Sequence, residues 1–222
     1  WETVARKLAH EIKNPLTPIQ LSIDRLREKY SSKVGDDSRD FENYLETINR
    51  QIKDIENLVN EFSNFARMPR PVFKKISIYN TALRAIDFYK MSSDNEIVFS
   101  TTNKNLEING DSDQLYRVFI NLIKNSKEAI ADIIAKKPDF KGKISIEILD
   151  NKDYIMVKLT DNGMGIPNTQ KAMTPYFTTK KNGTGLGLPI VNKIINEHSA
   201  ELVIKNNTSK EGLTVEIIFP KY

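Results

Sequence analysis

The stretch Ala9-His-Glu-Ile-Lys-Asn-Pro15 sets a histidine beside a glutamate in the middle of a helical pattern. In such a pair, the carboxylate of Glu11 can hold one nitrogen of His10 protonated and leave the other as a lone pair for an electrophile. Two solvated side chains on a helix surface are the commoner explanation of such a pair. Motifs elsewhere in the chain distinguish between these two interpretations.

Around this stretch, apolar residues recur at spacings of three and four, which is typical of one apolar helix face. They are Val4, Leu8, Ile12, Leu16, Ile19, Ile23 and Leu26. Pro15 and Pro18 lack the N–H groups that bond within a helix, so we expect a bend just after His10. A polar turn over 31–39 precedes a second predicted helix over about 40–66, whose apolar residues follow a near-heptad order. They are Phe41, Leu45, Ile48, Ile52, Ile55, Val59, Phe62 and Phe65.

The two helices form an antiparallel hairpin that cannot bury both apolar stripes by itself. A four-helix bundle built from two chains would bury them, so residues 1–66 predict a homodimer. The alternative is that the stripes pack on the rest of the same chain. Residues 67–75 contain two prolines and four cations and are predicted to be a linker.

From residue 76 to residue 222 the pattern becomes mixed α and β, which predicts a two-layer α/β domain with one sheet. Strands are expected over 96–101, 144–149, 154–160, 201–205 and 213–219, and helices near 79–91, 112–136 and 186–198. Asp111 and Gln114 form a possible capping box for the middle helix. His198, near the end of the last helix, is interpreted as a structural or exposed residue.

The amino-acid composition narrows the classes of function that fit this chain. The chain has 222 residues, no cysteine, and 33 basic against 29 acidic residues, giving a net charge of +4. This charge is too small and too dispersed to favour nucleic acid binding, and the absence of cysteine fits a reducing cytoplasm. We find no apolar run of about 18 residues, so no membrane span is expected. Because Trp1 stands in mid-helix pattern, we expect a fragment of a longer protein.

Asn121 and Asn125 are four residues apart on the long predicted helix, so both amides project from one face. Two neutral oxygen donors suit a Mg²⁺ ion that is otherwise held by water and nucleotide phosphates. Lys124 could reach a phosphate. Two solvated asparagines on a helix surface are the simpler alternative.

Glycine-rich segments follow. Asp161-Asn-Gly163-Met-Gly165 comes directly after a predicted strand, where a carboxylate beside flexible glycines can accept the exocyclic amine of a base. An ordinary turn is the alternative. Gly183-Thr184-Gly185-Leu186-Gly187-Leu precedes a helix whose N–H groups can face phosphate. It matches neither the dinucleotide fingerprint nor the P-loop. Before it, the stretch from Thr174 to Lys180 could form a lid, with Lys180 near the terminal phosphate.

In this order, His-Glu-x-x-Asn-Pro, Asn-x-x-x-Asn, Asp-x-Gly-x-Gly, Pro-Tyr-Phe-Thr-Thr-Lys and Gly-Thr-Gly-Leu-Gly-Leu resemble the H, N, G1, F and G2 boxes of bacterial sensor histidine kinases. The resemblance covers almost the whole chain. The stretches 9–20 and 61–69 further resemble the NtrY-type branch linked to nitrogen regulation.

The resemblance implies that ATP phosphorylates His10, that Glu11 orients the ring, and that the phosphoryl group passes to an aspartate of a response regulator receiver domain. Asn14 matches the position that places a water when the kinase works as a phosphatase. The family fold is a dimeric helical bundle followed by an ATP-binding domain of the gyrase, Hsp90, histidine kinase and MutL type. The fragment would then be cytoplasmic, and the full-length protein would reach the bacterial inner membrane through segments absent here.

The resemblance also assigns the nucleotide contacts. Asp161 matches the adenine-binding carboxylate, and Asn125, with Asn121, the Mg²⁺ site. The glycines of both glycine-rich segments match positions that contact the nucleotide or hinge the lid; they are Gly163, Gly165, Gly183, Gly185 and Gly187. Three departures stand out: the lid between Ile166 and Gly183 is slightly short, its Gln170-Lys-Ala-Met replaces an acidic, arginine-bearing turn, and Ser126 stands where alanine is usual.

Related ATPases are the first competitor for this function. They carry a glutamate four residues before the Mg²⁺-binding asparagine as the base for water, and here Asn121, which cannot take a proton, holds that place. This favours phosphoryl transfer over hydrolysis. A further alternative is an interaction module or phosphatase that binds nucleotide but transfers poorly.

Overall fold

The computed structural model describes residues 2–66, 68–90, 96–178, 180, 183–208 and 211–221. Trp1, Arg67 and Thr179, which belong to the predicted hairpin, linker and lid, lie outside these ranges. The chain divides into two compact units, one of Trp1–Pro69 with Thr178–Leu186 and the other of Arg70–Phe177 with Gly187–Tyr222. Within the described ranges, no helix has the length and apolar character needed to cross a membrane.

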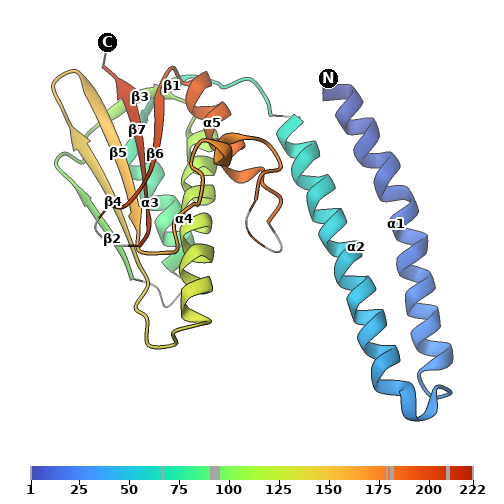
Figure 1. Cartoon of the computed structure of the whole chain (residues 1–222). Helices are drawn as coiled ribbons and strands as arrows, with labels where there is room; N and C mark the ends of the chain where they lie inside the picture. The colour runs from blue at the N-terminus through green and yellow to red at the C-terminus, as the bar shows by residue number, and fades with distance from the viewer. Residues whose placement is uncertain are drawn as a thin grey trace. The chain divides into compact units, whose positions relative to one another are not determined.

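The first unit contains the predicted helical hairpin. Helix α1 (Glu2–Tyr30) and helix α2 (Ser38–Ala66) run antiparallel and are joined by a turn that includes the 3₁₀ helix η1 (Gly35–Asp37) (Figure 1). α1 continues without interruption through Pro15 and Pro18, although each proline removes one backbone hydrogen bond. The hairpin core is formed by Leu16, Ile23, Leu45 and Ile52, with Phe41 packed against it.

Polar contacts fix the register of the two helices near their connecting turn. The Gln20 amide donates to Asn49 Oδ1 across the hairpin at 2.9 Å. Arg27 and the Ser31 hydroxyl both donate to the Glu42 carboxylate, at 3.0 and 2.7 Å. The bond from Ser31, together with the charge of Arg27, lowers the pKa of Glu42 despite partial desolvation. These contacts pair the C-terminal end of α1 with the N-terminal end of α2.

The second unit is built on a five-stranded sheet with the order β2-β4-β5-β7-β6. β2 pairs parallel with β4, and all the other neighbours are antiparallel. The strands are β2 (Glu96–Thr101), β4 (Lys143–Asp150), β5 (Tyr154–Asp161), β6 (Glu201–Asn206) and β7 (Leu213–Pro220). All five strands predicted from the sequence are therefore present.

Three helices form the second layer of this unit, beside the sheet (Figure 1). They are α3 (Ile78–Lys90), α4 (Ser112–Ile134) and α5 (Gly187–Glu197). Buried residues alternate with partly exposed ones along β4, β5 and β7, as expected when helices cover one face of a sheet. The hairpin followed by a two-layer α/β sandwich confirms the predicted fold class.

A small second sheet was not predicted. β1 (Lys74–Ser77) pairs antiparallel with β3 (Glu107–Gly110), with Lys74 opposite Gly110. β1 thus begins inside the segment that the sequence predicts as a linker. The domain boundaries at residues 66 and 76 stay predictions. The lid region contains one 3₁₀ helix, η2 (Lys171–Met173).

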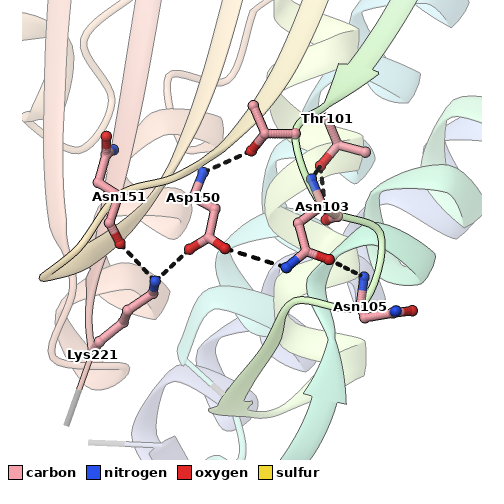
Figure 2. Close-up of polar contacts among 7 residues, drawn as sticks. Thr101, Asn103, Asn105, Asp150, Asn151 and Lys221 are labelled. Atoms are coloured by element: carbon pink, nitrogen blue, oxygen red, sulfur yellow. Dashed lines mark hydrogen bonds and ion pairs between the residues drawn. The ribbon is translucent and has the colours of Figure 1, made fainter.

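A polar cluster ties three chain segments together at the β4–β5 turn (Figure 2). Asp150 accepts a hydrogen bond from the Asn103 amide at 3.2 Å and one from the Lys221 ammonium. Lys221 also donates to the carbonyl of Asn151 at 2.6 Å, and the Asp150 N–H donates to the Thr102 hydroxyl at 3.1 Å. The loop after β2 and the end of β7 are therefore both anchored to this turn. The turn lies at the opposite end of β5 from Asp161.

Candidate active site

Asp161 is the last residue of β5, and the alternation along this strand directs it to the buried side. Only 3% of its surface is exposed. Oδ1 accepts hydrogen bonds from the backbone N–H groups of Gly163 and Leu213, at 2.9 and 3.3 Å. Oδ2 accepts one from the Ser126 hydroxyl at 2.8 Å. Three donors on one buried carboxylate hold it in a single orientation.

The chain around Asp161 is fixed by two asparagines at the end of β6. The Asn207 amide donates to the Asp161 carbonyl at 3.0 Å. Asn206 accepts from the Ile166 N–H at 2.9 Å and donates to the Ile166 carbonyl at 2.7 Å. The loop after β5 is therefore bonded to the last residue of β6 and to the residue that follows it. No motif in the sequence pointed to these asparagines.

Glycine is required at two positions of this loop. A Cβ atom at Gly163 would lie 2.7 Å from the Cβ of Ala129 on α4, closer than two carbons can approach. Gly165 has a φ of 71°, and a Cβ there would lie 2.8 Å from Oδ1 of Asn206. The loop consequently passes close to α4 on one side and β6 on the other.

Asn121 and Asn125 both project toward the first residue of α5. The position of a Cβ on Gly187 lies 3.4 Å from Asn121 Oδ1 and 3.6 Å from Asn125 Oδ1. The Asn121 amide nitrogen donates to the Arg117 carbonyl at 2.8 Å. The Asn125 Nδ2 lies at the same 3.6 Å as its Oδ1, so an Asn121 oxygen and the whole Asn125 amide group face a helix N-terminus, whose N–H groups favour negative charge.

Mg²⁺ fits this donor set only in combination with a nucleotide. Amide oxygens are ligands that Mg²⁺ accepts. The described ranges contain no group of three or more His, Cys, Asp or Glu residues that could hold a metal ion. Asn121 and Asn125 supply two oxygens at most, so phosphate and water would have to complete the coordination. The metal role of the two asparagines stays a prediction.

Lys124 is exposed on α4 between the two asparagines. Its ammonium lies 3.9 Å from the Glu128 carboxylate, one turn further along the same helix. Both side chains are more than one third exposed, so this pair adds little stability. The predicted contact between Lys124 and phosphate stays a prediction.

The segment before α5 belongs to the first unit, whereas Asp161 and the two asparagines belong to the second. The Gly183 N–H donates to the Lys180 carbonyl at 3.3 Å, and Gly185 has a φ of 68°. The Thr184 hydroxyl donates to the Glu61 carboxylate. Leu186 is completely buried, so its predicted nucleotide contact stays a prediction.

His10, Glu11 and Asn14 are all exposed on α1. His10 and Asn14 are one turn apart and therefore share a face. Glu11 forms a 3.9 Å ion pair with Lys7, one turn before it, rather than with the adjacent imidazole. The predicted orienting role of Glu11 stays a prediction.

His198 is buried and structural. The N–H of Asp111 donates to His198 Nε2 at 3.0 Å, so Nδ1 carries the proton and donates to the Ile194 carbonyl at 2.8 Å. Asp111 is the N-cap of α4, accepting from the N–H groups of Asp113 and Gln114. The predicted cap at Asp111 is confirmed. The predicted capping box is wrong, because the Asp111 N–H donates to His198 and not to the side chain of Gln114.

Two family models match the chain. "His Kinase A (phospho-acceptor) domain" matches residues 1–71. "Histidine kinase-, DNA gyrase B-, and HSP90-like ATPase" matches residues 110–222, half of the chain.

Relatives match over nearly the whole chain. The chain is 41% identical to a "Putative sensor histidine kinase NtrY-like" of Rickettsia prowazekii, over 99% of this chain and 36% of that protein. It is 37% identical to "Nitrogen regulation protein NtrY" of Azorhizobium caulinodans, over 98% of this chain and 28% of that protein. The chain therefore spans only about a third of the length of these curated relatives.

Solved structures share the fold. The nucleotide-free catalytic domain of histidine kinase ThkA is 28% identical with a TM-score of 0.58, covering 68% of this chain and 96% of that one. Histidine kinase ThkA in complex with response regulator protein TrrA has a TM-score of 0.66 at 24% identity, covering 99% of this chain and 61% of that one.

Proposed function

This chain belongs to the sensor histidine kinase family, and we propose that it phosphorylates its own His10 with Mg-ATP and then passes the phosphoryl group to an aspartate of a response regulator. The observation that carries the proposal is the combination of an exposed histidine at position 10, within the match to the phospho-acceptor domain, and a buried, oriented carboxylate at Asp161, within the match to the ATPase domain.

The nucleotide would bind between the end of β5 and the start of α5. Asp161 would accept the exocyclic amine of adenine. The N-terminus of α5 would face the phosphates, and the oxygens of Asn121 and Asn125 would hold Mg²⁺ against them. An Mg²⁺ ion held there would supply charge neutralisation for the phosphates.

In the transfer step, the lone-pair nitrogen of His10 attacks the γ-phosphorus, and the bond from phosphorus to the ADP oxygen breaks. The other ring nitrogen carries a proton, and the positive charge that develops on the ring is stabilised by Glu11. Asn121 replaces the carboxylate that would activate water in the related ATPases. Transfer to histidine is therefore favoured over hydrolysis.

A second copy of the chain would cover the hairpin. In each helix, the apolar residues at one heptad position are buried inside the hairpin. The apolar residues that follow them at a spacing of three are 36–44% exposed. The exposed positions, here called the outer stripe, are Ile12, Ile19, Leu26, Ile48 and Ile55. A monomer would leave this apolar stripe in water, so a four-helix bundle of two chains is the arrangement that buries it.

Family membership supports a proposal for the partner and the cellular setting. His10 and Asn14 share an exposed face of α1 on which a receiver domain can dock, and Asn14 would place a water for dephosphorylation of that partner. The chain would form the cytoplasmic part of a protein held in the inner membrane by segments outside this sequence.

The proposal is tested by incubating the chain with γ-labelled ATP and Mg²⁺, beside His10→Gln and Asp161→Asn. We expect acid-labile, base-stable label on the wild type only, with ATP binding retained in His10→Gln and lost in Asp161→Asn. ATP turnover without labelled protein would support the stand-alone ATPase, and ATP binding without label or turnover would support the phosphatase or interaction module. Label that persists in His10→Gln would show that another residue is the acceptor.

A further inference from the structure

Ser126 is a buried residue of α4 that contacts the carboxylate of Asp161. It follows Asn125 on α4, and only 3% of its surface is exposed. Its hydroxyl lies 2.8 Å from Asp161 Oδ2 and donates a hydrogen bond to it. A buried side-chain hydrogen bond to a carboxylate is among the stronger hydrogen bonds in proteins.

The two carboxylate oxygens of Asp161 accept hydrogen bonds from different donors. Each carboxylate oxygen has two lone-pair sites. Those of Oδ1 are used by the N–H groups of Gly163 and Leu213. A donor from a ligand that bonds to Oδ2 would share this oxygen with the Ser126 hydroxyl. The direction in which Oδ2 accepts a second donor depends on the hydrogen bond from Ser126.

We propose that Ser126 is a positioning residue for base recognition, which fixes Asp161 Oδ2 in the orientation that accepts the exocyclic amine of adenine. This inference rests on the proposed function, since it concerns the same nucleotide site. Alanine at this position would remove the hydrogen bond to Oδ2 and keep the two hydrogen bonds to Oδ1. The hydroxyl of Ser126 bonds to Asp161, the proposed base-binding residue, so we expect it to act on nucleotide affinity and base preference rather than on the transfer step.

The test compares ATP with purine riboside triphosphate, which lacks the exocyclic amine. Dissociation constants are measured for the wild type, for Ser126→Ala, and for the control Ser145→Ala, whose hydroxyl lies 3.4 Å from Glu147 on β4 and not on Asp161. We expect Ser126→Ala to weaken ATP binding about five- to tenfold and purine riboside triphosphate binding hardly at all. Ser145→Ala should behave like the wild type. Labelling of His10 at saturating ATP should be unchanged, so that KM rises and kcat does not.

Three results for Ser126→Ala would overturn the inference: equal losses for both nucleotides, unchanged ATP affinity, or tighter ATP binding. Thermal unfolding of each variant shows whether a loss merely reflects the fold. Ser126→Cys, which keeps a weaker donor of similar shape, should give an intermediate preference. A wild type that does not prefer ATP over the analogue would instead refute base recognition by Asp161, and with it the proposed nucleotide site.

Discussion

Asp111 joins three parts of the second unit through a single residue. Its carboxylate accepts hydrogen bonds from Val72 and from two N–H groups at the start of α4, and its own N–H donates to His198. Desolvation raises the pKa of Asp111, but these backbone hydrogen bonds and the nearby His198 outweigh it, so the pKa lies below its ordinary value. The folded state therefore favours the ionised form.

This lowered pKa predicts a loss of stability in acid. A carboxyl whose pKa is depressed by folding stabilises the protein above its unfolded pKa, and the effect disappears as the pH falls through the folded pKa. The free energy of unfolding of the wild type should thus fall more steeply from about pH 5 to about pH 2.5 than that of Asp111→Asn, which keeps a capping oxygen but cannot titrate. Denaturant unfolding across this range measures the difference, and parallel curves would contradict it.

The cap at Asp111 could be predicted from the sequence, but its contact with His198 could not. Asp111 could be predicted as a cap because the signal lies within a few residues. His198 lies 87 residues away, and nothing local indicates that its ring accepts the Asp111 N–H. Ser126 was missed for the same reason, since it contacts a carboxylate 35 residues further along the chain.

At the scale of elements, the hairpin helices depend on their buried heptad positions. Leu16 is 6% exposed within the hairpin core, whereas Leu21, on the same helix, is 54% exposed. Leu16→Ala should lower the free energy of unfolding of the hairpin by about 2–5 kcal/mol, and Leu21→Ala by about 0.5 kcal/mol or less. Thermal or denaturant unfolding of both variants tests this. Similar losses for the two leucines would mean that the hairpin packs on a different face.

The strands that were predicted and those that were missed differ in length and pattern. β4, β5 and β7 are eight residues long with clear alternation, which gives a strong local signal. β1 and β3 have four residues each, with the sequences KKIS and EING, and are stabilised by pairing between residues such as Lys74 and Gly110 that lie far apart in the sequence. No window of the sequence contains that pairing. The helices were easier to predict because their apolar periodicity extends over several turns.

At the scale of the whole molecule, the proposed dimer depends on the outer stripe. Ile19→Glu combined with Ile48→Glu should convert the dimer into a monomer, because two buried carboxylates per chain would have to be desolvated at the interface. Sedimentation of the wild type and the double variant measures this directly. The matched control is Leu21→Glu with Tyr44→Glu, which places the same charges on exposed residues outside the stripe. A double variant that sediments as the wild-type dimer would place the interface elsewhere.

The order of the five motifs predicted the architecture of the whole chain, because each motif recurs at a fixed place in one family. Individual motifs did not suffice, since each also fits an ordinary turn or helix surface. The roles of His10, Asn125 and Asp161 were carried over from the family. The hydrogen bonds that hold Asp161 in place required the three-dimensional structure.

The central claim is that this chain transfers a phosphoryl group from ATP to His10. The most direct measurement is to incubate the chain with Mg-ATP, digest it at neutral to alkaline pH, and locate the phosphoryl group by peptide mass spectrometry. We expect a single modified peptide that contains His10, and no modified peptide from Asp161→Asn, which should not bind ATP. A phosphoryl group on any other residue, or accumulation of ADP with an unmodified chain, would contradict it.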